Sequence, residues 1–119
     1  MATRHPSGGL QLSPVVVALD GVGRAVVSTR ETARKTRNLD RDPWVSLCVM
    51  TDRFFGDWIQ VDGQADIVHL PDALEPLVDY YRTLSGEHPD WDDYRAAMRR
   101  ERRVLLRITL TRAGPDTHG

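Results

Sequence analysis

Basic and hydroxyl side chains gather in residues 28–39 of the 119-residue chain, where the pattern changes from strand to helix. The basic side chains are Arg30, Arg34, Lys35 and Arg37, and the hydroxyls come from Ser28, Thr29 and Thr32. The free amides of a helix start favour an anion, and arginine adds a forked, charge-assisted pair of donors. This combination predicts a phosphate site. The alternative is an exposed basic helix face whose charges are simply solvated.

A second group of polar side chains alternates along two predicted strands. Trp58 and Gln60 share one face of the strand predicted at residues 57–69. Tryptophan can stack on a flat ring, while a glutamine amide can bind the polar edge of that ring. The alternative is a face at a dimer interface or on the outside of a barrel. Gln11 and Ser13 alternate on the first predicted strand and allow the same two interpretations.

Other kinds of site have little support in the sequence. The four histidines show no metal-ligand spacing, so no metal site is predicted. Cys48 falls in an apolar strand and is expected to be inert core. No motif pairs a nucleophile with a base, so the catalytic residues are not assigned. If the chain is an enzyme, a bound cofactor is expected to supply the chemistry.

Length and charge narrow the class of protein. The chain carries 16 Lys+Arg and 17 Asp+Glu, a formal net charge of −1. This near balance argues against a general nucleic-acid binder, and the single cysteine argues against a disulfide framework. No apolar run is long enough for a membrane span, and the N-terminus does not resemble a signal peptide. We therefore expect one cytoplasmic globular domain over residues 1–119.

The elements that must position these side chains follow from periodicity and turn signals. Strands are predicted at residues 10–19, 24–29, 44–51, 57–69 and 104–111, and helices at 31–39, 71–84 and 91–99. Pro14 places the first strand at an edge or a bulge, and Gly63 indicates a bulge within the long strand. Thr29 or Thr32 is expected to cap the first helix, Gly86 to end the second and Asp90 to cap the third. Alternation places Cys48 and Met50 on one face of the strand at 44–51. The tail from Arg112 is expected to be loose. The fold class is mainly β with peripheral helices, arranged as a small closed or partly closed barrel.

Several longer segments carry a resemblance to a known family. They are residues 11–14, 35–39 with 41–43, 60–63, 80–82 and 85–95. With them, the chain resembles the pyridoxamine-phosphate-oxidase-like, FMN-binding split β-barrel proteins over residues 2–115. Within that group it is most similar to the actinobacterial deazaflavin-dependent oxidoreductases, which use coenzyme F-420.

The resemblance implies a homodimer with the cofactor bound between the subunits. In flavin-binding relatives an Arg-Lys pair grips the FMN phosphate, and Arg34 and Lys35 fall at that place. The resemblance further implies cofactor contacts from Ser28, Thr29 and Gln60, and a ring pocket lined by Gln11, Ser13 and Pro14. The implied reaction passes a hydride from reduced F-420 to an electron-poor small molecule, with the proton from solvent, Tyr80 or Tyr81. The alternatives are an FMN flavoprotein and a non-catalytic flavin or deazaflavin carrier.

The chain departs from the family pattern in two places. Close relatives often have an arginine where this chain has Ala33, so the tail contacts are expected to be rearranged, with Arg30 or Arg37 as substitutes. Family members also usually begin with a helix and most of a first strand before the position of Met1. We therefore expect the N-terminal helix and part of the first strand to be absent, which would expose one edge of the barrel.

Overall fold

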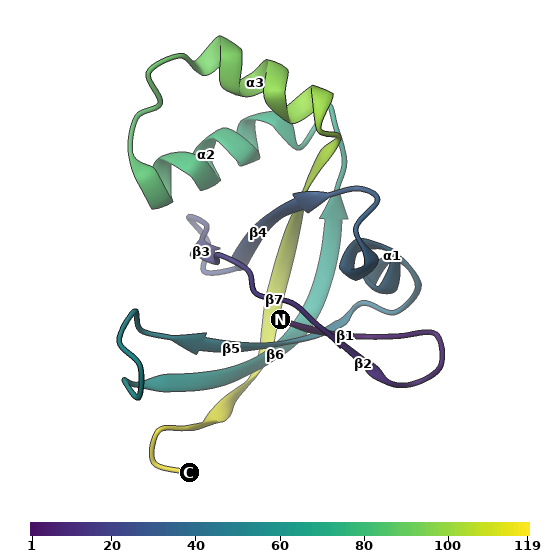
Figure 1. Cartoon of the computed structure of the whole chain (residues 1–119), viewed down its shortest axis with the longest axis vertical. Coiled ribbons are helices and arrows are strands. Elements are labelled where there is room, and N and C mark those ends of the chain that lie inside the picture. The colour runs from purple at the N-terminus through teal and green to yellow at the C-terminus, as the bar shows by residue number, and fades with distance from the viewer.

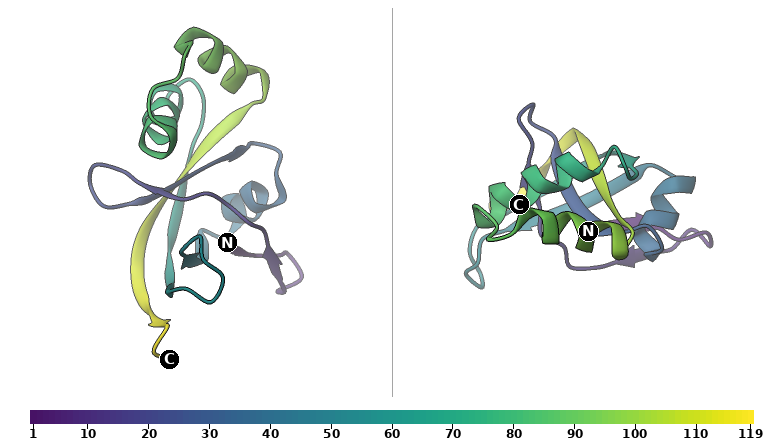
Figure 2. Two further views of the ribbon diagram at one scale, coloured as in Figure 1. Left: turned by 60° about the vertical axis from the view of Figure 1, so that its left-hand side comes forward. Right: turned by 90° about the horizontal axis from the view of Figure 1, so that it is seen from above.

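The structure, a computed structural model, describes residues 1–119 as seven strands and three helices (Figure 1). The strands are β1 (Ala2–Arg4), β2 (Leu10–Leu12), β3 (Ala18–Leu19), β4 (Ala25–Arg30), β5 (Trp44–Met50), β6 (Trp58–Val68) and β7 (Arg103–Asp116). The helices are α1 (Arg34–Arg41), α2 (Leu74–Ser85) and α3 (Trp91–Arg100). Helices α2 and α3 lie side by side at one end of the molecule, and α1 lies apart from them (Figures 1 and 2). None of the helices has the length and apolar character needed to cross a membrane.

The seven strands form one antiparallel sheet in the order β2-β1-β5-β6-β7-β4-β3. Its two edge strands, β2 and β3, are consecutive in the chain and are joined by residues 13–17. A linker of this length spans at most about 20 Å, so the sheet must curl to bring its edges together. Residues 13–17, called the strap below, therefore cross the open side of a split barrel, and the expected fold class is confirmed.

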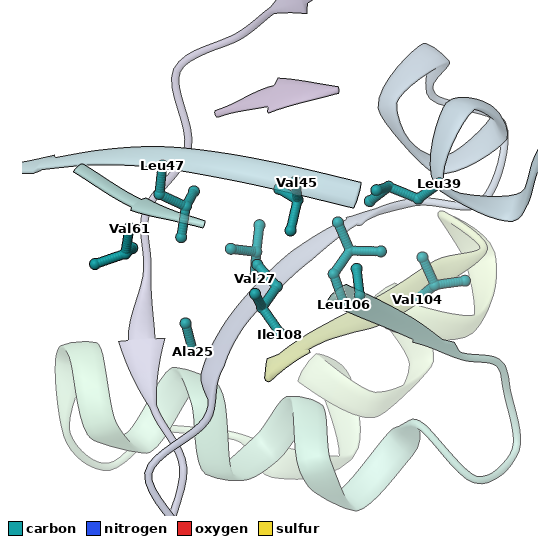
Figure 3. Close-up of a cluster of buried hydrophobic side chains, with 10 residues drawn as sticks. Ala25, Val27, Leu39, Val45, Leu47, Val61, Val104, Leu106 and Ile108 are labelled. Carbon is teal, nitrogen blue, oxygen red and sulfur yellow. The ribbon is translucent and has the colours of Figure 1, made fainter. Parts of the chain in front are cut away.

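Apolar side chains from alternate strand positions fill the inside of the barrel (Figure 3). The largest fully buried ones include Val27, Val45, Leu106 and Ile108. Val15 and Val17 of the strap pack on this cluster, whereas Val16 between them is 62% exposed. The strap thus covers the core at the split with the same inward and outward alternation as a strand.

A second cluster lies on the outer face of the sheet, under α2 and α3. It joins Val26 of β4 and Leu105 of β7 to Leu77 of α2 and Tyr94 of α3. The Tyr94 hydroxyl donates a hydrogen bond of 2.8 Å to the Leu77 carbonyl oxygen, and burial raises the pKa of Tyr94 to about 12. Two apolar layers with a shared sheet therefore stabilise the fold.

Local signals in the sequence fix several element ends. Helix α2 is capped at its C-terminus by Gly86, whose φ is 76°. Glycine adopts this positive φ with little strain because it has no Cβ atom. The Asp90 side chain accepts a hydrogen bond from the Asp93 amide and so caps α3, as the sequence predicts. The predicted bulge at Gly63 is confirmed by a shift in the β6–β7 register between Asp62 and Gly63.

Four sequence predictions are wrong in detail. The strand predicted at 10–19 is interrupted by the strap, because Pro14 has no amide for a ladder. The tail from Arg112 is not loose, since β7 pairs with β6 as far as Asp116. Cys48 is exposed rather than core, because it belongs to the outer row of β5, which no helix covers there. The predicted threonine caps at residues 29 and 32 are absent, and α1 begins only at Arg34.

Candidate cofactor-binding site

The start of α1 presents unpaired positive charge. Its N-cap residue, Ala33, is extended, and no side chain caps the first turn. The Thr36 hydroxyl instead donates 2.7 Å to the Arg30 carbonyl oxygen and so fastens the helix start to the end of β4. The predicted anion ligands are Arg30, Arg34, Lys35 and Arg37. None of them forms an ion pair within the chain. Together with the free amides of the first turn, this cluster can bind an anionic group.

A chain of side-chain hydrogen bonds connects α1 to β2. Asn38 Nδ2 donates 3.1 Å to Thr3 Oγ1, and both residues are buried. Thr3 Oγ1 lies 3.3 Å from Gln11 Oε1, and Gln11 Nε2 donates 3.0 Å to the Leu12 carbonyl oxygen. The helix that carries Arg34 and Lys35 is therefore tied, through β1, to one of the predicted ring-lining residues.

The strap borders an apolar pocket of about 460 Å³. One wall is formed by residues 14–17 and the other by residues 47–52, with Met1 at one end. Eight of its eleven lining residues are hydrophobic, which suits a flat ring more than a free charge. Pro14, a predicted ring contact, is in the wall, whereas Arg34 and Lys35 lie outside it.

Ser13 lies at the start of the strap with an unsatisfied hydroxyl. Its amide donates 3.0 Å to the Met1 carbonyl oxygen, and its carbonyl oxygen accepts 2.9 Å from the Met1 amino group. Ser13 Oγ is buried and has no hydrogen-bond partner. Most buried hydroxyls are paired, so this one is an exception. Ser13 does not itself line the strap pocket, so its contact with a cofactor stays a prediction.

The outer faces of β5 and β6 continue the site with a polar group. Gln60 Nε2 donates 3.2 Å to Ser46 Oγ and 3.1 Å to Asp62 Oδ1, so its amide group is held in place. Hydrogen bonds from Ser46 and Gln60 hold the pKa of Asp62 below its ordinary value. Gln60 lies opposite Cys48 in the β5–β6 ladder, and Cys48 lines the strap pocket. Gln60 itself does not line the pocket, so its contact with a cofactor stays a prediction.

Exposed apolar side chains surround the tip of the β5–β6 hairpin. Trp58 lies opposite Met50 in the ladder, and these two residues line a second pocket of about 490 Å³ with Phe54 and Phe55. Exposure reaches 71% for Met50, 85% for Phe54 and 93% for Phe55. Trp58 therefore lines this second pocket and not the strap pocket, although Cys48 and Met50 line both.

The structure places Ser28 and Thr29 on opposite faces of β4. Thr29 is 5% exposed and pairs with Val104 on the barrel side, whereas Ser28 pairs with Leu105 on the side of α2. Neither side chain lines the strap pocket, so their cofactor contacts stay a prediction. Ser28 lies close to Tyr80, whose hydroxyl donates 2.7 Å to the Val16 carbonyl oxygen on the strap. Burial raises the pKa of Tyr80 above its ordinary value.

Sequence reasoning missed the residues that connect these parts. Thr3 and Asn38 form the link between α1 and β2, and Cys48 and Met50 connect the strap pocket to Gln60 and Trp58. The alternation along β5 did place Cys48 and Met50 on one face. Nothing in the local sequence indicated that this face would lie beside the strap, because that contact depends on the curl of the sheet.

Comparison with known proteins shows the family and the fold of the chain. Residues 1–114 match the family model for pyridoxamine 5'-phosphate oxidase. Among solved structures, the fold is similar to the conserved hypothetical protein Rv2991 from Mycobacterium tuberculosis, with 28% identity and a TM-score of 0.72. That match covers 94% of this chain and 71% of the other.

Two further structures share the fold at lower identity. An F-420 reductase is 23% identical, with a TM-score of 0.71 over 95% of this chain and 85% of the other. A pyridoxamine 5'-phosphate oxidase-related, FMN-binding protein from Nostoc punctiforme is 15% identical, with a TM-score of 0.67 over 94% of this chain and 69% of the other. With the split barrel and the match over nearly its whole length, this chain belongs to the pyridoxamine 5'-phosphate oxidase family.

Proposed function

We propose that the protein is an oxidoreductase that binds coenzyme F-420 and passes a hydride to an electron-poor small molecule. The observation that carries this proposal is the cluster of unpaired cations at the uncapped start of α1. An anionic cofactor tail would give Arg34 and Lys35 the partners that the chain itself does not supply. The fold likeness to an F-420 reductase supports the choice of cofactor, with FMN as the alternative because its phosphate needs the same cations.

The residues beside the strap would orient the ring. Ser13 Oγ and the Gln11 amide would meet its polar edge, and Pro14 would pack against its face. The oxygen of the Gln60 amide has no hydrogen bond in the chain, so it remains free to accept one. When bound, the deazaflavin supplies the hydride, and the apolar walls would exclude water from the transfer. Tyr80 reaches the strap at Val16, where its hydroxyl proton is held in a hydrogen bond to the Val16 carbonyl oxygen.

A homodimer would complete this site. The apolar side chains at the tip of the β5–β6 hairpin are exposed next to the strap pocket, and such a patch is typical of a protein interface. We propose that a second copy covers Met50, Phe54, Phe55 and Trp58 and that Trp58 then frames the cofactor. Light scattering after size-exclusion chromatography tests this directly. A Phe54→Ser, Phe55→Ser variant should be monomeric, whereas a monomeric wild-type protein would contradict the proposal.

A non-catalytic carrier is the second candidate. The observation that favours it is the lining of the strap pocket, where Cys48 and Asp52 are the only titratable side chains. A carrier needs a fitting apolar pocket and a tail anchor, but no acid or base. Turnover separates the two candidates: oxidation of reduced F-420 by enone, imine or quinone acceptors supports the enzyme. Tight binding with no turnover by any acceptor supports the carrier.

Titration with F-420 and with FMN, followed by absorbance or fluorescence, tests the site. Replacing Arg34 and Lys35 together by glutamine should weaken binding by about 2–4 kcal/mol, roughly 30- to 1000-fold, if each makes a charge-assisted contact. Arg99→Gln is the matched control, because Arg99 is an exposed arginine on α3 without an ion pair. Unchanged affinity in the double variant would refute the tail site. Micromolar binding of FMN with none of F-420 would identify a flavoprotein instead.

A further inference from the structure

A separate pocket lies on the other side of the sheet, between α2 and the β3–β4 hairpin. Its volume is about 370 Å³, and its lining mixes apolar residues with charged ones from α2, the β3–β4 turn and β7. It shares no lining residue with the strap pocket. The cofactor proposed above therefore leaves this pocket unused.

Three arginines line this pocket, and only two of them have acidic partners. Arg24 Nε lies 2.7 Å from Asp20 Oδ2. Arg82 lies 2.8 Å from Glu87 and 3.6 Å from Asp79. These pairs occupy the two carboxylates of the lining, Asp20 and Asp79.

Arg107 of β7 is the exception. Its Nε is buried and has no hydrogen-bond partner. Asp66 is its neighbour in the β6–β7 ladder, but the two side chains form no ion pair. A half-buried guanidinium that lacks both an acidic partner and an acceptor for its Nε–H is unfavourable unless something else supplies one.

We propose that this pocket binds a small organic anion through Arg107. A carboxylate or phosphate would give the guanidinium that lines this pocket the acidic partner that the chain does not supply, and the flat guanidinium suits either group. The walls suit a small apolar body attached to that anion, because Val26, Leu105 and Pro76 line the pocket with Tyr80. The ligand class is therefore a small molecule with one anionic head and a compact apolar part.

Tyr80 gives this site a physical connection to the strap. Its ring lines the anion pocket, while its hydroxyl donates 2.7 Å to the Val16 carbonyl oxygen, and Val16 lines the strap pocket. A bound anion would pack next to the side chain that holds the strap. Resonances of the strap should therefore shift along with those of the anion pocket.

The test is a nuclear magnetic resonance titration of the full chain with two probes, benzoate and inorganic phosphate. We expect the Nε–Hε signal of Arg107 to move, together with amides of residues 19–24 and of Tyr80, and to saturate in the millimolar range. Tighter binding of benzoate would identify a carboxylate ligand, and tighter binding of phosphate would identify a phosphate ester. Arg107→Gln should weaken binding about tenfold or more.

Two controls keep the result interpretable. Arg107→Lys retains the charge and tests the guanidinium geometry if the glutamine variant does not fold. Arg99→Gln removes an exposed arginine far from the pocket in the chain and should leave binding unchanged. The proposal is overturned if neither probe moves the Arg107 signal, or if folded Arg107→Gln binds both probes as well as wild type. F-420 titration of Arg107→Gln measures the other site separately, so failure of one proposal does not hide the other.

Discussion

Replacing Gly63 by alanine should destabilise the protein strongly, because the bulge leaves no room for a side chain. A Cβ atom built at this position would lie 2.4 Å from the Thr109 carbonyl oxygen and 2.7 Å from Ile108 Cγ2. Ordinary contacts begin near 3.4 Å, so β7 would have to move by about 1 Å. The neighbour is backbone of a paired strand rather than the end of a flexible side chain, so the strain cannot relax easily.

We expect Gly63→Ala to lower the free energy of unfolding by about 2–3 kcal/mol, the upper part of the roughly 1–3 kcal/mol that overpacking a core usually costs. For a chain of this size that corresponds to a fall in Tm of roughly 10 °C. Urea denaturation followed by circular dichroism measures the change. Gly21→Ala is the matched control, because a Cβ there meets nothing within 4 Å, and its effect should stay below about 1 kcal/mol. A Gly63→Ala midpoint equal to that of the control would refute the reasoning.

Three further substitutions test the packing and the charges. Tyr94→Phe should lower the free energy of unfolding by about 1–2 kcal/mol, because the Tyr94 hydroxyl no longer donates to the buried Leu77 carbonyl oxygen. Urea denaturation measures this change, and an unchanged midpoint would contradict it. Asp90→Ala should lower stability by about 1 kcal/mol through loss of the α3 cap, whereas Asp90→Ser should retain most of it, as thermal unfolding will show. Arg102 lowers the pKa of Glu31 from its ordinary value of 4.5, so this pair stabilises the fold fully above that pH. The stabilisation is lost as pH falls through the lower pKa of the folded state, and Glu31→Gln should flatten that acid dependence of the urea midpoint.

The sequence predicted those parts of the fold that depend on local signals. Helix α3 follows from the Asp90 cap, α2 ends at the expected glycine, and alternation placed the two faces of β5 and β6 correctly. The strap was missed because its course depends on more than local sequence. The sequence of the strap resembles that of a strand, because Val15 and Val17 point inward and Val16 points outward. Whether the segment hydrogen-bonds to a neighbouring strand, however, depends on how the whole sheet curls.

The candidate site was predictable to a similar extent. The sequence placed the basic cluster at the start of α1, with a solvated helix face as the alternative, and the structure shows that these cations have no ion pair within the chain. Of the predicted ring contacts Gln11, Ser13 and Pro14, the structure places Pro14 in the wall of the strap pocket. The hydrogen-bond link through Thr3 and Asn38 was not predictable. It joins residues 35 positions apart, and neither residue type marks such a contact in a sequence.

The position of β7 in the sheet has a consequence for how the chain folds. This strand is the last of the seven in chain order, yet it lies between β6 and β4. It pairs with β4 from Arg103 to Ile108 and with β6 from Leu105 to Asp116. Until it emerges from the ribosome, β4 and β6 each present an unpaired edge, and the apolar faces that meet in the barrel remain open. Contacts between residues this distant in sequence form slowly. Until they form, the unpaired strand edges are exposed and can pair with other chains. Nascent chains stalled before residue 103 should therefore depend on chaperones.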